Sequence, residues 1–184
     1  MVRSALLLLA LTMSAGCGAA PPADPPAATV TAPAAPPLQG RSTAGGEFSL
    51  QDVAGAPAVV LFVRGSFCPV CRERLRALAA SAGAYRDAGA RVVAVTLDPP
   101  PVASGLAHEL GLALPLVSVD AATFRRWGVW SPGQPMPHPG DFVLDPLGRI
   151  RYARIGTVAA DRVSDVALLG ILDSLHAAGA LARR

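Results

Sequence analysis

Two cysteines in a Cys-x-x-Cys pair, Cys68 and Cys71, stand where an apolar run passes into a helix-forming run, and this order constrains the fold most. The run from Ala58 to Val63 predicts a buried strand. The segment from Pro69 to about Arg86 predicts a helix, which accepts a proline in its first turn. Both sulfurs then lie at a helix N-terminus, where free N–H groups and the helix dipole stabilise a thiolate. Because thiolates attack disulfides and peroxides, the pair predicts redox chemistry.

The N-terminal residues 1–17 resemble a bacterial export signal. Arg3 supplies the positive charge, Ala5 to Leu11 is apolar, and small residues precede Cys17. The apolar run is too short for a stable membrane-spanning helix. A cysteine after Ala-Gly resembles a lipoprotein processing site, although Ser14 stands where leucine is usual. We therefore expect an extracytoplasmic protein (periplasm or cell surface) held to the membrane by lipid on Cys17, with a cleaved soluble product as the alternative.

The remaining chain divides by composition into two parts. Residues 18–45 are dominated by Ala and Pro without periodicity, which predicts a disordered tether. Residues 46–184 alternate strand and helix patterns, which predicts one α/β domain with helices on both faces of a sheet. Besides the strand and helix around the cysteines, the patterns predict strands at 48–53, 91–97, 116–119, 141–144 and 149–155 and helices at 102–110, 121–127 and 159–178.

Charge and cysteine content exclude several classes of function. The net charge is +3, every basic residue is arginine, and these arginines are scattered, so we do not expect nucleic-acid binding. There are three cysteines, which is too few for a zinc site of four. If Cys17 carries lipid, only Cys68 and Cys71 are left, and in an oxidising compartment they can form a disulfide.

Three segments carry a resemblance to a known family: Phe48-Ser49-Leu50 with Gly55-x-Pro57, the run from Val59 to Cys71, and the run from Pro139 to Ile150. On these segments, residues 47–175 resemble the thioredoxin-fold redoxins, in particular AhpC/TSA-like proteins and membrane-tethered thioredoxins of the TlpA type. The resemblance implies a thioredoxin-like fold, in which a central mixed sheet has helices on both faces.

The resemblance also implies roles for particular residues. Cys68 would be the attacking thiolate and Cys71 the resolving thiol. Pro139 would be a cis-proline that presents the backbone of His138 to an extended substrate. Phe67 replaces the tryptophan usual before the first cysteine, in a hydrophobic lip. No cofactor is expected beyond the cysteine pair, and the expected partners are protein or small-molecule disulfides and thiols, with a thiol electron donor or an oxidant.

Two departures from the family pattern bear on mechanism. The buried acid that thioredoxins carry six residues before the first cysteine is Phe62 here, which leaves His138 as a candidate for proton handling or as an exposed loop histidine. Peroxiredoxins carry Thr or Ser three residues before the peroxidatic cysteine, Pro seven before it, and Arg three before the late Phe. The chain has Gly65, Leu61 and Pro139 at those positions.

The loss of the hydroxyl and the guanidinium removes groups that polarise a peroxide, although Arg64 or Arg72 is a candidate electrostatic substitute. We therefore expect thiol–disulfide exchange, with a thiol peroxidase as the alternative, in which Cys68 is peroxidatic and Cys71 resolving.

Three further hypotheses carry less weight. A purely structural disulfide between Cys68 and Cys71 would close a small ring and stabilise little. A Cu(I) carrier of the Sco type would add Met136 or His138 to the two thiolates, but that type has one more residue between its cysteines. Trp130 belongs either to the core or to a wall of the substrate groove.

Overall fold

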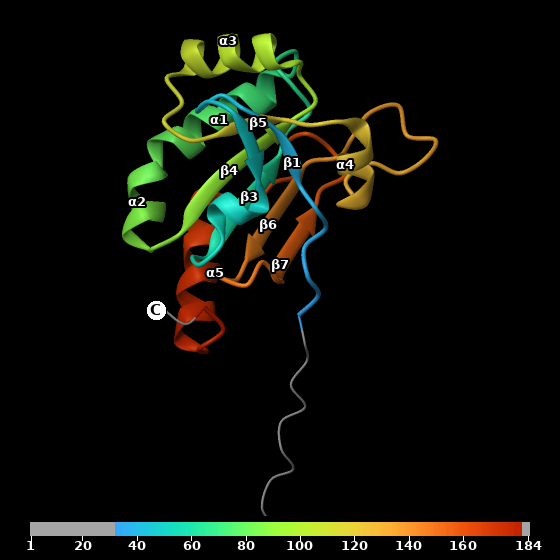
Figure 1. Ribbon diagram of the computed structural model, residues 1–184. Coiled ribbons are helices and arrows are strands. Elements are labelled where there is room, and N and C mark those ends of the chain that lie inside the picture. Colours follow the sequence, from blue (N-terminus) through green and yellow to red (C-terminus); the bar gives the residue numbers. More distant parts are fainter. Residues whose placement is uncertain (1–31, 182–184) are drawn as a thin grey trace, which may run out of the picture. The chain divides into compact units, whose positions relative to one another are not determined.

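A seven-stranded mixed sheet forms the centre of the structure, a computed structural model that describes residues 32–181 (Figure 1). The strand order is β2-β1-β5-β4-β3-β6-β7. Strands β3, β4 and β5 are parallel, whereas β1, β2, β6 and β7 each run antiparallel to their neighbours. The strands are β1 (Gln39–Ser42), β2 (Glu47–Ser49), β3 (Ala58–Phe62), β4 (Arg91–Thr96), β5 (Leu116–Ser118), β6 (Gly140–Leu144) and β7 (Ile150–Ile155).

Helices cover both faces of the sheet, as predicted. One face packs with side chains of α1, α2, α3 and α5 in a first hydrophobic cluster, which contains both cysteines of the pair. The other face packs with α4 in a second cluster. The helices are α1 (Pro69–Ala80), α2 (Ala82–Asp87), α3 (Pro100–Leu110), α4 (Ala121–Arg126) and α5 (Asp165–Ala177), with a short 3-10 helix η1 (Leu50–Val53) after β2.

Strand β3 ends directly before the cysteine turn, and its central place explains its composition. All five of its residues are buried, because β4 and β6 flank it and helices cover both faces. Side chains alternate between the faces, so Leu61 joins the first cluster and Phe62 joins the second. The segment that leads to the cysteines therefore starts from a fully buried strand, at the edge of the sheet where α1 begins.

The domain begins earlier than the sequence predicts. Residues 32–45, which belong to the predicted tether, are ordered: β1 pairs with both β2 and β5, and Leu38 is fully buried. The prediction of a disordered tether is wrong for this part, because backbone pairing holds β1 without a hydrophobic repeat in its sequence. The predicted export signal, Cys17 and the rest of the tether lie outside the described residues. In residues 32–181, no helix is long and apolar enough to cross a membrane.

Three predicted elements are shorter than expected, and at two of them a capping hydrogen bond marks the boundary. The strand predicted at 48–53 changes into η1, where Asp52 accepts a hydrogen bond from the Ser49 N–H. The first helix breaks at Ser81, so that α1 and α2 are separate. The last helix begins at Asp165, where the hydroxyl of Ser164 accepts a hydrogen bond from the N–H of Ala167.

Candidate active site

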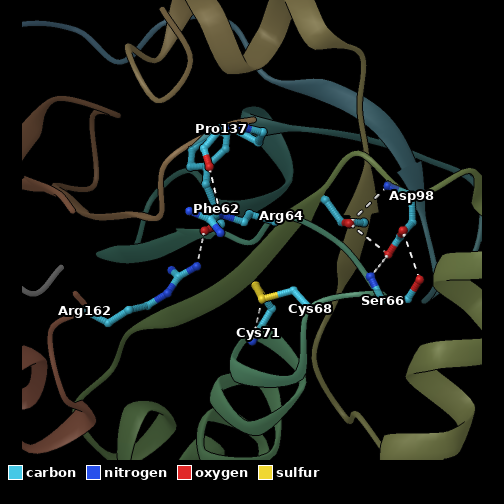
Figure 2. Close-up of a disulfide and its surroundings, with 9 residues drawn as sticks. Phe62, Arg64, Ser66, Cys68, Cys71, Asp98, Pro137 and Arg162 are labelled. Carbon is cyan, nitrogen blue, oxygen red and sulfur yellow. Dashed lines mark hydrogen bonds between the residues drawn. A yellow bond between two sulfur atoms is a disulfide. The ribbon is translucent and has the colours of Figure 1, made fainter. Parts of the chain in front are cut away.

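Cys68 and Cys71 lie in the first turn of α1 and form a disulfide (Figure 2). Cys68 is the N-cap residue, and its Sγ accepts a hydrogen bond from the backbone N–H of Cys71 at 3.2 Å. The Cα atoms are 5.2 Å apart, so one helical turn holds both sulfurs together. Cys71 is fully buried and Cys68 keeps 6% of its surface exposed, so Cys68 is the less buried of the two cysteines. The predicted placement of the pair at a helix N-terminus is confirmed.

A buried carboxylate holds the turn that leads to Cys68. Asp98 Oδ2 accepts the backbone N–H of Ser66 at 2.7 Å, and Asp98 Oδ1 accepts the Ser66 hydroxyl at 3.2 Å. The hydroxyl of Thr96 donates to Asp98 Oδ2 at 3.1 Å. Sequence reasoning missed these groups, although topology gives a signal: Asp98 and Ser66 follow neighbouring parallel strands, whose carboxyl ends meet at one edge of the sheet.

A second buried pair, Arg162 and Asp141, fixes the end of β3. Arg162 Nη2 donates to the carbonyl oxygen of Phe62 at 2.7 Å, and its Nη1 contacts Asp141 Oδ1 at 3.3 Å. Asp141 Oδ2 also accepts the N–H of Val163. Burial lowers the pKa of Arg162, and the charge of Asp141 opposes that effect. Sequence reasoning missed this pair, because Arg162 comes from the connection between β7 and α5.

A cavity of about 310 Å³ runs along the first turns of α1 beside Val70, which separates the two cysteines. Its α1 wall includes Arg74 and Ala77, and its other wall includes Arg162 and Val163. Apolar and charged side chains both line this cavity, which reaches the cysteine turn at Val70 and includes neither cysteine in its walls.

Pro139 does not have the predicted geometry. Within residues 32–181 every peptide bond is trans, so the prediction of a cis-proline is wrong. Two backbone hydrogen bonds hold this segment extended: the His138 N–H donates to Val129 O at 2.8 Å, and the Gly156 N–H donates to Pro139 O at 2.9 Å. Pro139 therefore packs beside Gly156 and leads straight into β6.

His138 lies in a hydrogen-bonded loop network. The amide of Gln134 is oriented by Ser131, whose N–H donates to Gln134 Oε1 at 2.9 Å. Gln134 Nε2 is therefore the donor to His138 Nε2 at 2.6 Å, which places the imidazole proton on Nδ1. With that acceptor nitrogen occupied, the geometry gives no support to His138 as the group that takes a thiol proton.

The two predicted aromatic groove residues have different positions. Phe67, directly before Cys68, is 67% exposed, as a hydrophobic lip requires. Trp130 packs against the second cluster, carries Arg125 over its ring at 5.1 Å and donates its indole N–H to Gln134 O. The structure does not bring Trp130 into the cluster that contains Cys68.

The copper hypothesis required Met136 or His138 beside the cysteine pair. In the described part of the chain, no three His, Cys, Asp or Glu side chains gather as a metal site would require. Met136 is 39% exposed on the loop before β6.

The mixed sheet and the cysteine pair at the start of α1 define a thioredoxin-fold protein with a disulfide at the N-terminus of a helix. The model of the AhpC/TSA family matches residues 31–153, two thirds of the chain, and the chain belongs to this family. The resemblance seen in the sequence is therefore confirmed.

Curated relatives include the mitochondrial thioredoxin-dependent peroxide reductases of Homo sapiens and Bos taurus. Each is 29% identical to the chain over 141 residues, which cover 70% of this chain and 54% of the relative. The chain thus spans about half the length of the curated relatives that it matches.

Solved structures of peroxiredoxins share the fold. Xanthomonas campestris peroxiredoxin Q superposes with a TM-score of 0.66 at 24% identity, covering 74% of this chain and 90% of that one. Enterococcus faecalis AhpC superposes with a TM-score of 0.73 at 17% identity, covering 81% and 93%. Mycobacterium tuberculosis BcpB superposes with a TM-score of 0.66 at 18% identity, covering 79% and 96%.

Proposed function

We propose that this protein is a thiol peroxidase in which Cys68 reduces a hydroperoxide and Cys71 resolves the oxidised product. The observation that carries the proposal is the N-cap position of Cys68, whose sulfur accepts an N–H bond and has Cys71 within bonding reach. Family membership and the peroxide-reducing relatives favour this activity over the disulfide exchange that the sequence alone favours.

The chemistry follows from the two sulfurs. The Cys68 thiolate attacks the terminal oxygen of the hydroperoxide, the O–O bond breaks, and the departing alkoxide takes a proton to become an alcohol. Cys68 is then a sulfenic acid. The sulfur of Cys71 attacks it, water leaves with the thiol proton, and the disulfide forms. An external dithiol then reduces the disulfide by exchange, and we propose a donor of the thioredoxin class from the activity of the curated relatives.

Thiol–disulfide exchange is the second candidate, and a specific observation favours it. The disulfide closes within one turn of α1, so neither sulfur needs to move far to form or break it. In addition, Gly65 and Pro139 occupy the positions where peroxiredoxins carry the hydroxyl and the guanidinium. Both activities begin with the Cys68 thiolate, so the reaction partner distinguishes them.

Stopped-flow oxidation of the reduced full-length protein tests the proposal. Reduced protein is mixed in parallel with hydrogen peroxide, with an organic hydroperoxide and with a mixed-disulfide peptide, and the loss of free Cys68 thiol is followed. Fast reaction with either peroxide supports the peroxidase. Fast reaction with the peptide and slow reaction with both peroxides would replace it with disulfide exchange.

We also propose that the protein works outside the cytoplasm, anchored through lipid on Cys17 after removal of residues 1–16. The support is the sequence of the first seventeen residues. Metabolic labelling with a fatty acid and membrane fractionation test it, with Cys17→Ser as the matched variant. Equal membrane recovery and no label in either protein would reject the anchor.

A further inference from the structure

Two arginines stand at equal distances from the cysteine turn in sequence: Arg64 is four residues before Cys68, and Arg72 is four residues after it. A peroxide reaction needs a donor that stabilises the developing negative charge on oxygen. Because Pro139 occupies the position of the usual arginine, that donor must come from another place in the fold.

The positive charge of Arg72, on α1, is balanced by an ion pair. Its Nη2 forms an ion pair with the carboxylate of Glu109 on α3. Two other arginines close to the site are also paired: Arg162 contacts Asp141, and Arg74 contacts Asp165 at 2.7 Å. The positive charges of all three are therefore balanced by neighbouring carboxylates.

Arg64 is held in place by a hydrogen bond, and no ion pair in residues 32–181 balances its positive charge. Its Nε donates to the carbonyl oxygen of Pro137 at 3.0 Å, which holds the half-buried side chain against the loop before β6. Among residues 32–181, no carboxylate lies within ion-pair distance of its guanidinium, so both Nη groups stay free of acidic partners.

Arg64, whose charge has no carboxylate partner in the described residues, follows the end of β3. Figure 2 shows Arg64 above Cys68 and Cys71 in this view, and Arg162 to the left of the two cysteines and directed toward Phe62. Besides the dominant effect of burial, the charges of Arg74 and Arg64 lower the pKa of Arg162, as expected for guanidinium groups that lie close together. Of the four arginines Arg64, Arg72, Arg74 and Arg162, Arg64 is therefore the one whose charge no carboxylate in residues 32–181 balances.

We infer that Arg64, and not Arg72, stabilises the Cys68 thiolate and orients the hydroperoxide through its two free Nη groups. This inference rests on the proposed peroxidase for the second role but not for the first. The guanidinium donates hydrogen bonds to the peroxide oxygens and to the departing alkoxide, and it gives up no proton itself. The alkoxide takes its proton from solvent.

Three variants test the assignment. Arg64→Gln removes the charge and keeps an amide donor, Arg64→Lys keeps the charge and loses the planar fork, and Arg72→Gln is the matched control. Two quantities are measured on the reduced proteins: the rate constant with hydrogen peroxide, and the pH midpoint of thiolate absorbance in the ultraviolet. Thermal unfolding checks that each variant folds.

We expect Arg64→Gln to react about 100-fold more slowly with peroxide and its thiolate midpoint to move to higher pH. Arg64→Lys should keep the midpoint and lose about tenfold in rate, because a point charge replaces a fork. Arg72→Gln should stay within about twofold of the wild type in rate, because an exposed ion pair contributes little.

Equal effects of Arg64→Gln and Arg72→Gln, or no effect of either, would overturn the assignment. If Arg64→Gln fails to fold, Arg64→Lys still tests the assignment. A wild-type rate constant with hydrogen peroxide in Arg64→Lys would show that the planar guanidinium does not orient the peroxide. A slow wild-type reaction with peroxide would reject the peroxidase instead, and the thiolate midpoint would still test the first role of Arg64.

Discussion

Asp98 and Ser66 are joined by two hydrogen bonds, in which one carboxylate accepts both the backbone N–H and the hydroxyl of the serine. The contact links the end of β4 to the turn two residues before Cys68. Asp98 is 92% buried, since only 8% of its surface is exposed, and its hydrogen bonds compensate for the burial of a charged group. The position of the attacking sulfur therefore depends on a residue that lies far away in the sequence.

Asp98→Ala should destabilise the protein by about 2–3 kcal/mol, because the half-buried Ser66 N–H and the Ser66 and Thr96 hydroxyls all lose their carboxylate acceptor. Ser66→Ala removes only the hydroxyl bond and should cost about 1 kcal/mol. Urea unfolding of the oxidised proteins measures both values. If the two variants lose equal stability, the backbone bond to Asp98 does not hold the turn as the structure indicates.

Gly65→Ala should be destabilising by about 1–3 kcal/mol through backbone strain. Gly65 has a φ of +150°, and an added Cβ would lie 2.8 Å from Asp98 Oδ1 and 3.0 Å from the Phe67 ring. The control is Gly105→Ala on α3, where an added Cβ meets nothing within 4 Å and should stabilise the helix. Thermal unfolding of both variants checks the prediction, and an unchanged midpoint for Gly65→Ala would contradict it.

Arg162→Met should cost about 3–5 kcal/mol, because it leaves the buried carboxylate of Asp141 without its cation. The double variant Arg162→Met with Asp141→Leu should be more stable than the single variant, since it removes both charges. A double-mutant cycle by urea unfolding measures the coupling. Additive losses would show that the two side chains do not act as a pair.

Stability should fall as pH rises above about 10, because Tyr85 resists ionisation in the folded state. Tyr85 is fully buried, and its hydroxyl donates to Asp165 Oδ1 at 2.7 Å. Burial, and then the hydrogen bond and charge of Asp165, raise the pKa of Tyr85. The unfolded chain therefore ionises first, and the free energy of unfolding should decrease by up to about 1.4 kcal/mol per pH unit.

The matched variant for this pH dependence is Tyr85→Phe. It should be less stable near neutral pH, because Asp165 loses a donor, and its stability should change less above pH 10. The chain has no lysine and two tyrosines, so few groups compete in this range. Urea unfolding of the oxidised proteins across alkaline pH measures the profiles; parallel profiles would rule out Tyr85 as their cause.

Cys71→Ser should separate the first chemical step from the second. Cys68 in this variant should still react with peroxide, but its sulfenic acid cannot pass to a disulfide, so turnover with a dithiol should be lost at the resolving step. Cys68→Ser should abolish the first step. Mass spectrometry of the oxidised variants identifies the trapped species, and full turnover by Cys71→Ser would assign resolution to another thiol.

The sequence predicted the order of strands and helices from Ala58 to Leu144, because apolar periodicity and breaking residues are local properties of the chain. It also predicted the redox turn, because a strand that ends before Cys-x-x-Cys places both sulfurs at a helix N-terminus. The prediction failed at β1, because the composition of these residues indicates a tether. Backbone pairing with β2 and β5 orders them instead. The prediction of a cis bond at Pro139 is also wrong, and the surroundings of this segment include hydrogen bonds to the distant residues Val129 and Gly156.

By itself, the sequence of this protein predicted that Cys68 and Cys71 lie together at the start of a helix, and it carried the resemblance to the AhpC/TSA family that the family model confirms. It left Arg64 and Arg72 as equivalent candidates and contained no visible partner for Ser66. Only the tertiary structure distinguishes the two arginines and supplies that partner, because it places Glu109 beside Arg72 and Asp98 beside Ser66. The physical reason is that the effect of a charge depends on which other charges lie within a few ångströms, and folding brings those together from distant parts of the chain.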